Sequence, residues 1–203
     1  MLVVGLTGGI ASGKSTVSRV LTKMGAEIID CDLLVHELTR PGSRCWQEIV
    51  DTFGKDFLRQ DGSLNRRKLG LLVFDNPDAL EKLNAIVHPA VIGIIKERIE
   101  EARKSPEPPD VLVVDAPLLI EAGMVPLVDE VWVVKVDEST QMERLIARDR
   151  LTLREALSRI KAQMPLEEKI KFADVVIDNS GIVEETERQV RDSLARSGNP
   201  PDR

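Results

Sequence analysis

The chain has 203 residues, of which 42% are hydrophobic and 31% are charged, so it is long enough for one or two domains with a substantial core. Its formal net charge of −6 argues against a general affinity for nucleic acid or anionic membranes, and an aromatic content of 3% argues against a stacking surface for single-stranded nucleic acid. The apolar runs, such as 111–114 and 131–134, are far too short to cross a bilayer. We therefore expect no nucleic-acid partner and no membrane partner.

The N-terminal residues predict a phosphate-binding loop between a strand and a helix. Residues 2–7 are apolar enough for a short buried strand, and residues 16–24 have the pattern of a helix. Between them, residues 8–15 match G-x-x-x-x-G-K-S, the P-loop, whose backbone N–H groups surround a phosphate at the positive end of a helix. Lys14 is expected to reach the β- and γ-phosphates, and the Ser15 hydroxyl is expected to hold Mg²⁺. The predicted nucleotide-binding residues of this segment are Gly8, Gly9, Ala11, Ser12, Gly13, Lys14, Ser15 and Thr16.

The start of the chain also bears on where the protein works. It enters the first predicted strand directly, without a basic stretch or a cleavage site, so no signal peptide is visible. A cytoplasmic location is therefore expected. The cytoplasm is reducing, and two cysteines, Cys31 and Cys45, are too few for a disulfide framework, so we expect no structural disulfide.

Two acidic residues follow the second predicted strand, which spans residues 26–30 after a helix-ending Gly25. Asp30 and Asp32 are expected at the sheet edge where the P-loop opens, and residues i and i+2 at a strand end project the same way. One carboxylate is expected to orient and deprotonate an acceptor hydroxyl, while another helps to hold Mg²⁺. The alternative for Asp32 is structural, because aspartate is a favoured N-cap for a helix that starts at Leu33.

Residues 33–103 contain no convincing strand and follow a helical pattern. A crossover helix needs only about a dozen residues, so we expect a helical insertion that holds the second ligand. Within it, Arg66 follows Asn65 at the start of a helix and is a candidate contact for an anion. His88 and Pro89 are expected to begin a further helix with His88 at the N-cap, as a structural residue or as a substrate contact.

Three further apolar runs, at residues 111–115, 130–136 and 174–178, complete a set of five strands. Nearly continuous apolar strands that alternate with helices predict an α/β fold whose parallel sheet is covered on both faces. Asp115 ends the third strand, where P-loop proteins place an acidic residue that assists Mg²⁺; alternatively, it only forms a turn before the proline that follows. Glu121, on the next segment, either faces the acceptor or has no role at the site.

Arginines cluster on and after the helix that follows the fourth strand. Arg144 and Arg148 are four positions apart and hence share one helix face. An arginine placed over a triphosphate neutralises the charge that develops during phosphoryl transfer, so both residues are candidates for a role at the nucleotide. The alternative is a solvated helix in which Glu143 and Asp149 are their partners.

A second, shorter insertion spans about residues 148–172. Thr152 is expected to cap its first helix, and Pro165 is expected to divide it into two short helices. A basic, polar pair of helices beside a P-loop is typical of a lid, in which Arg159 is a further candidate for phosphate contact. The last residues, 197–203, are expected to fray.

Taken in order, these motifs resemble the dephospho-coenzyme A kinase family over essentially the full length of the chain. The P-loop alone is shared by many proteins, whereas the ordered set is not. Ala11 stands where the family usually has glycine, and Cys31 where it usually has alanine; both residues are small and leave every donor and charge in place. The resemblance rests on residues 5–10, 12–15, 30–32, 64–66, 88–89, Asp115, 117–119, Glu121, Gln141, Arg144, 148–149, 159–160, Gln163, 173–174, Ile177, Asn179 and Gly181.

The resemblance implies a three-layer P-loop fold with a five-stranded parallel sheet, a helical domain that binds coenzyme A and a small helical lid. The implied reaction moves the γ-phosphoryl group of ATP to the ribose 3′-hydroxyl of dephospho-coenzyme A, with Mg²⁺ as cofactor. The protein is expected to be a monomer or a small homo-oligomer. The expected domains are a nucleotide-binding core (1–33, 111–147 and 173–196), an acceptor-binding domain (34–110), a lid (148–172) and a tail (197–203).

The resemblance also implies roles for single residues. It assigns the catalytic base to Asp32, and it assigns transition-state support to Lys14 and Arg144. Arg148 is expected to join the P-loop in binding the nucleotide. Substrate contacts are expected from Asp30, Asp32, Arg66, His88, Asp115 and Glu121, and Mg²⁺ ligands from Ser15, Asp32 and Asp115.

Two other classes of protein fit part of these observations. A different small-molecule kinase of the same fold, acting on a nucleotide or a sugar acid, keeps the P-loop and the lid but does not need the long insertion with its residues 65–66 and 88–89. A GTP-binding switch protein carries Asn-Lys-x-Asp after a late strand, and the corresponding residues 134–137 lack the asparagine.

Overall fold

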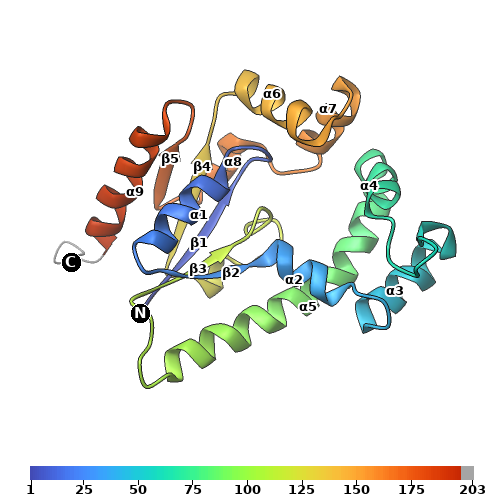
Figure 1. Cartoon of the computed structure of the whole chain (residues 1–203), viewed down its shortest axis with the longest axis horizontal. Helices are drawn as coiled ribbons and strands as arrows, with labels where there is room; N and C mark the ends of the chain where they lie inside the picture. The colour runs from blue at the N-terminus through green and yellow to red at the C-terminus, as the bar shows by residue number, and fades with distance from the viewer. Residues whose placement is uncertain (198–203) are drawn as a thin grey trace. The chain divides into compact units, whose positions relative to one another are not determined.

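The computed structural model describes residues 1–197 of the chain. Within them lies one five-stranded sheet with the strand order β2-β3-β1-β4-β5 (Figure 1). The pairings of β1 with β3 and with β4, and of β4 with β5, are parallel, as expected of apolar strands in a sheet that is covered on both faces. The strands are β1 (Leu2–Gly8), β2 (Glu27–Asp30), β3 (Val111–Asp115), β4 (Glu130–Lys135) and β5 (Val175–Asp178).

Two helices cover one face of this sheet (Figure 1). They are α1 (Lys14–Lys23) and α9 (Val183–Ser197), and they pack against each other and against β1 and β5. Their apolar sides bury Val17 and Val190 in a cluster with Trp132 of β4. Each fully buried side chain of this kind contributes about 1.5–3 kcal/mol relative to an exposed one, so the cluster holds α1 firmly behind the P-loop.

The opposite face of the sheet is packed by the segment that follows β3. Side chains alternate across a strand, so Gly5 faces away from the α1–α9 cluster that contains Val4 and Leu6. Leu119 lies so close to Gly5 that a Cβ there would come within 2.6 Å of the leucine side chain. Glycine in the middle of β1 therefore lets the chain after β3 lie directly on the sheet.

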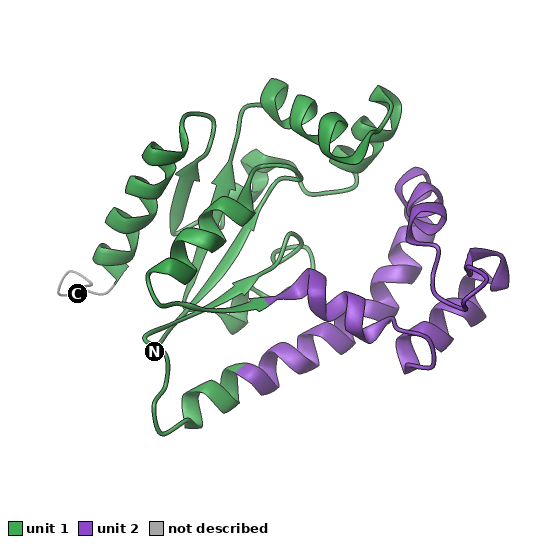
Figure 2. Cartoon of the chain, viewed as in Figure 1, with its two compact units in different colours: residues 1–29, 99–203 green, residues 30–98 purple. Residues whose placement is uncertain are grey.

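The chain divides into two compact units (Figure 2). The first contains residues 1–29 and the chain from Ile99 onward, including the P-loop and the sheet; the second contains Asp30–Arg98. Beyond the end of β2, the second unit is helical, apart from a single antiparallel bridge between Leu58 and Leu64. Its elements are α2 (Cys31–Leu38), α3 (Arg44–Phe53), the short 3-10 helix η1 (Lys55–Phe57), α4 (Arg66–Asp75) and most of α5 (Pro77–Lys104).

Apolar side chains at helical spacing form the interior of the second unit. Ile49 on α3, Val73 on α4 and Ile95 on α5 are all buried. Trp46 on α3 donates its Nε1–H to the carbonyl of Gly62 at 3.0 Å, which ties α3 to the turn that precedes α4. The second unit therefore has a core of its own.

The prediction that His88 and Pro89 begin a helix is wrong, because both residues lie inside α5. That helix starts at Pro77, a residue type favoured at a first helical position, and the Asn76 side chain accepts the backbone N–H of Ala79 at 3.1 Å. Pro89 removes one internal hydrogen bond of the helix. The helix nevertheless continues, because apolar residues on both sides of the proline are buried in the unit.

The segment between β4 and β5 is helical, as expected. Thr152 caps its second helix in a reciprocal capping box with Glu155, and Pro165 occupies the N-cap position of its third, so both predicted boundaries are confirmed. The helices are α6 (Glu138–Asp149), α7 (Leu153–Lys161) and α8 (Leu166–Ile170).

The predicted tail begins at Ser197, but this residue ends α9 and its hydroxyl donates to Glu130 Oε2 at 2.7 Å. The rest of the tail, residues 198–203, lies outside the described residues. Across the described chain, no helix combines the length and the apolar character that crossing a bilayer requires.

Candidate functional site

The P-loop connects β1 to α1 and presents the N-terminus of that helix. A turn closes its apex through the hydrogen bond from the Ser12 N–H to the Gly9 carbonyl, which is 3.0 Å long. Gly13 follows in the left-handed region, with φ of 82°, and is the N-cap of α1. No side chain caps α1, which lies entirely within the described residues, and its first turn holds no acidic residue. The positive end of the helix is therefore available to an anion.

Asn179, directly after β5, packs on the P-loop and explains the second glycine of the motif. Its Nδ2 donates to the Ser12 carbonyl at 2.8 Å, and its Oδ1 accepts the Thr186 hydroxyl at 3.0 Å. A Cβ at Gly13 would overlap the Asn179 amide, and the positive φ of Gly13 independently favours glycine. Asn179 was not among the predicted site residues, although a polar residue at the carboxyl end of a parallel strand is a usable signal.

The apex of the P-loop contains a backbone conformation that glycine would adopt more easily. Ala11 has φ of 59°, a conformation that costs an L-residue about 1–2 kcal/mol and that glycine adopts without this cost. The neighbouring Ile10 is held from both sides: its N–H donates to Gln163 Oε1 at 2.9 Å, and its carbonyl accepts Gln141 Nε2 at 2.8 Å. Side chains from distant parts of the chain therefore support the loop.

Lys14, the first residue of α1, contacts Asp115, the last residue of β3. Lys14 Nζ donates to Asp115 Oδ1, and the two side chains are only 17% and 8% exposed. The sheet brings them together, because β3 pairs with β1 in a register that sets Asp115 opposite Leu6, shortly before the P-loop. The carboxylate that ends β3 is thus neutralised by the P-loop lysine.

A buried lysine that was not among the predicted site residues lies near this pair. Lys169 on α8 is fully buried, and its Nζ donates to the Pro117 carbonyl at 2.7 Å and to Glu121 Oε1 at 3.0 Å. Burial lowers the pKa of Lys169; the Glu121 carboxylate opposes that shift, and the charge of Lys14 adds to it. In the sequence, Lys169 sits in a short charged helix and has the same appearance as a solvated surface lysine, so no local signal distinguishes it.

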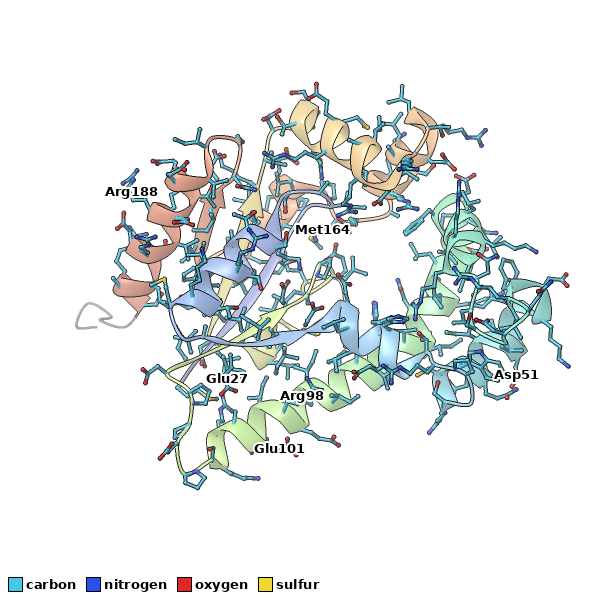
Figure 3. All side chains as sticks on the ribbon, in the orientation of Figure 1. Glu27, Asp51, Arg98, Glu101, Met164 and Arg188 are labelled. Atoms are coloured by element: carbon cyan, nitrogen blue, oxygen red, sulfur yellow. The ribbon has the colours of Figure 1, made fainter. Side chains whose placement is uncertain are left out.

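Glu121 is engaged by the segment that joins α7 to α8. Besides Lys169, its Oε1 accepts the backbone N–H of Met164 at 3.0 Å, and Figure 3 labels this methionine. Its other oxygen, Oε2, is buried and has no hydrogen-bond partner among the described residues. A buried carboxylate oxygen without a donor is costly, and a ligand hydroxyl or amide can satisfy it.

The two predicted arginines of α6 have different surroundings. Arg144 Nη1 donates to the Asn179 carbonyl at 3.3 Å and so lies close to the start of α1. Arg148 pairs with Asp149 through two hydrogen bonds of 2.8 and 3.1 Å, and Arg159 on α7 donates to the same carboxylate at 2.7 Å. The hydrogen bond from Arg148 is the largest cause of the lowered pKa of Asp149. Arg148 therefore pairs with Asp149, as the alternative of a solvated helix predicts. Arg144, in contrast, faces the P-loop.

Asp30 and Asp32 belong to the second unit, at the start of α2. Asp30 Oδ1 accepts the N–H groups of Asp32 at 2.9 Å and Leu33 at 3.0 Å, so it caps the helix. The alternative of Asp32 as the cap of a helix beginning at Leu33 is wrong, because α2 begins at Cys31 and Asp30 fills the cap. Asp32 instead lies exposed in the first turn. Cys31 and Cys45 are both buried.

Arg66, the first residue of α4, contacts two side chains of the second unit, and neither is a carboxylate. Its Nη2 lies 2.9 Å from His36 Nδ1 and also donates to the Thr39 hydroxyl. Burial of the guanidinium end lowers the pKa of Arg66, and the positive charge of Arg59 adds to the shift. A guanidinium held by such partners suits an anionic group of a ligand. The remaining candidate of this unit, His88, is half-buried inside α5.

Comparison with known proteins covers both units. Residues 2–185 match the model of the family described as dephospho-CoA kinase. A dephospho-CoA kinase of Carboxydothermus hydrogenoformans is 53% identical over 188 residues, which cover 93% of this chain and 90% of that protein. The crystal structure of TT1252 from Thermus thermophilus has a TM-score of 0.76 and 34% identity, covering 96% of this chain and 97% of the other. Dephospho-CoA kinase from Campylobacter jejuni has a TM-score of 0.68 and 27% identity, with coverages of 97% and 98%.

Proposed function

We propose, because this chain belongs to the dephospho-CoA kinase family, that it transfers the γ-phosphoryl group of ATP to the ribose 3′-hydroxyl of dephospho-coenzyme A. The products are coenzyme A and ADP, and the reaction is the last step of coenzyme A synthesis. The observation that carries the proposal is the contact between Lys14 and Asp115 at the P-loop, in a chain whose residues 2–185 match the family. A P-loop kinase needs a lysine for the phosphates and an acidic residue for the metal at this place.

The P-loop is proposed to bind the phosphates of ATP. When ATP binds, the ammonium group of Lys14 exchanges its contact with Asp115 for contacts with the β- and γ-phosphates. The N-terminus of α1 supplies backbone N–H donors. Arg144 supports this site, because it lies near the start of α1 and can neutralise charge that develops during transfer. The proposed nucleotide-binding residues are Gly8, Gly9, Ala11, Ser12, Gly13, Lys14, Ser15, Thr16 and Arg148.

Mg²⁺ is proposed to be held by the Ser15 hydroxyl and the Asp115 carboxylate, with Asp32 as a further predicted ligand. The residues present fit this ion, because they supply oxygen atoms and because Asp115 is a mostly buried carboxylate in contact with Lys14. Among the described residues, no group of three or more His, Cys, Asp or Glu could hold a metal ion. This suits an ion that takes most of its ligands from phosphates and water. Bound Mg²⁺ neutralises charge on the β- and γ-phosphate oxygens.

The second unit is proposed to bind dephospho-coenzyme A. Arg66 suits the pyrophosphate of this substrate, because guanidinium groups form bidentate contacts with such oxygens. Asp32 is the proposed base for the 3′-hydroxyl, and Asp30 fixes the backbone of Asp32 by capping α2. His88 is a further proposed contact. Glu121 of the first unit is proposed to use its buried Oε2 toward the substrate.

Release of ADP tests the proposal directly. With Mg²⁺ and ATP, the wild-type protein should form ADP at a rate that depends on dephospho-coenzyme A, and phosphorus NMR should show a new 3′-phosphate on the product. A nucleoside monophosphate and a sugar acid serve as alternative acceptors. Equal rates with those acceptors, or with water alone, would contradict the assignment. Gel filtration of the same sample tests the expectation of a monomer or small homo-oligomer. We propose that the protein is located in the cytoplasm.

A further inference from the structure

Two glutamine side chains bind the backbone of one residue, Ile10, at the apex of the P-loop, one on each of the peptide units that flank it. The carboxamide oxygen of Gln163 accepts the N–H of Ile10, and the carboxamide nitrogen of Gln141 donates to the Ile10 carbonyl. Gln141 comes from α6 and Gln163 from the segment between α7 and α8, so all three residues belong to the first unit. The proposed function assigns no role to either glutamine. We refer to Gln141 and Gln163 as the glutamine clamp.

The apex of the loop has a conformation that needs external support. Ala11 is held in the left-handed region, which a residue with a Cβ disfavours. Ile10 precedes it inside the turn that the Ser12 N–H closes on the Gly9 carbonyl. The two hydrogen bonds fix the peptide units before and after Ile10, and the second of these contains the N–H of Ala11, so they fix the orientation of the loop N–H groups that follow. A Cβ at Gly9 would lie 2.6 Å from Gln141 Nε2, so glycine at this position leaves the space that the clamp needs.

Each glutamine is presented from a fixed support. The residue after Gln163 is Met164, whose N–H binds Glu121, and Glu121 in turn pairs with the fully buried Lys169. Gln141 lies one helical turn before Arg144, which binds the Asn179 carbonyl. Neither clamp residue is therefore a loose surface side chain that touches the loop by chance.

We propose that Gln141 and Gln163 are positioning residues that preorganise the P-loop for phosphate before the nucleotide arrives. The inference rests on the proposed binding of ATP at this loop. Without the clamp, Ala11 relaxes toward right-handed backbone and only a fraction of the molecules keeps the binding-competent loop. The apparent dissociation constant for the nucleotide rises by the inverse of that fraction. Once ATP has bound, the loop is the same and transfer proceeds as before.

Methionine substitutions test this role, because they remove the hydrogen bonds and keep the length of the side chain. For Gln163→Met and for Gln141→Met, we expect the Kd for ADP and the KM for ATP to rise about tenfold, as the loss of one hydrogen bond allows. The kcat at saturating ATP should stay within about twofold, and the KM for dephospho-coenzyme A should not change. Gln47→Met is the matched control, since Gln47 is exposed on α3 and donates to Asp51.

A second substitution separates preorganisation from a general structural role. Glycine enters the left-handed region without the penalty of alanine, so Ala11→Gly should reduce the dependence on the clamp. Measured against Ala11→Gly alone, the added Gln163→Met change should raise the Kd for ADP only about threefold. Equal increases in both backgrounds would overturn the proposal, as would a lower melting temperature with unchanged nucleotide constants. A wild-type protein that does not bind ADP would instead contradict the proposed function.

Discussion

Two charge pairs of the first unit, Lys14 with Asp115 and Lys169 with Glu121, lie mostly inside the protein, whereas Asp32 and Arg66 of the second unit lie near the surface. Lys14 contacts Asp115 with both side chains mostly buried, and Lys169 is fully buried beside Glu121. In the second unit, Asp32 is exposed in the first turn of its helix. A buried charge that loses its partner is far more costly than an exposed one. Substitutions in the first unit should therefore affect stability together with activity.

The helical unit should behave differently. Arg66 is exposed in part and meets His36 and Thr39 rather than a carboxylate, so its removal leaves no buried negative charge behind. A ligand can therefore replace the contacts of Arg66 at little cost to the fold. Single substitutions in both units test this contrast.

Asp32→Asn removes the negative charge of the proposed base while it keeps the shape of the side chain. We expect kcat to fall by about 10²–10⁴, the usual contribution of a general base, with little change in the KM for ATP or in the melting temperature. Steady-state kinetics measures the change, with Glu37→Gln on the exposed side of the same helix as the control. Loss of ATP binding that added Mg²⁺ restores would instead identify Asp32 as a metal ligand.

Lys14→Ala removes the point charge that follows the phosphates, and we expect kcat to fall by about 10²–10³. Because Asp115 is only 8% exposed, the variant should also lose stability, and adding Asp115→Asn should restore stability without activity. Lys23→Ala is the control, since this lysine of α1 is largely exposed. A Lys14→Ala variant that keeps a tenth of the wild-type turnover would refute the assignment of this residue.

Lys169→Met leaves the Glu121 carboxylate without its partner in the interior. We expect the free energy of unfolding to fall by about 3 kcal/mol, near the lower end for a broken buried pair, because the Glu121 side chain is still 20% exposed. The double variant with Glu121→Gln should regain most of that loss in urea denaturation. Lys171→Met, which removes an exposed pair with Glu168, should cost no more than about 1 kcal/mol. Equal losses at both lysines would contradict the contrast between buried and exposed charges.

Arg66→Ala tests the helical unit. We expect the KM for dephospho-coenzyme A to rise about tenfold, as the loss of a charge-assisted hydrogen bond allows, with the KM for ATP and the melting temperature nearly unchanged. Arg67→Ala, on the exposed side of the same helix, should leave both constants in place. A lower melting temperature with intact acceptor binding would show that Arg66 is a structural residue instead.

The parts of the fold that depend on local sequence could be predicted. Apolar runs indicated both ends of every strand to within one residue. Thr152 and Pro165 indicated helix boundaries in the α6–α8 segment, because caps and prolines act within one turn. Pro89 shows the limit of this reasoning. Its local signal for a helix start was outweighed by the burial of the surrounding helix, which the sequence does not reveal.

The site could be predicted only where one short motif carries the chemistry. The P-loop revealed Lys14, and the end of an apolar strand revealed Asp115. Lys169 and the two clamp residues were not selected, because their roles depend on partners far along the chain: Gln163 and Ile10 are 153 positions apart. Polar side chains of this kind look like surface residues until the fold supplies their partners.

The two tryptophans of the chain divide between the two units, and the chain has no tyrosine. Trp132 is fully buried in the sheet and donates to Glu130, whereas Trp46 donates to the Gly62 carbonyl in the helical unit. The intrinsic fluorescence of a Trp46→Phe variant therefore reports on the first unit alone, and that of a Trp132→Phe variant on the second. Coincident denaturation curves would show that both units unfold as one cooperative system. If the curves separate, the shift that ADP causes in the Trp46 signal measures how strongly nucleotide binding is coupled to the helical unit.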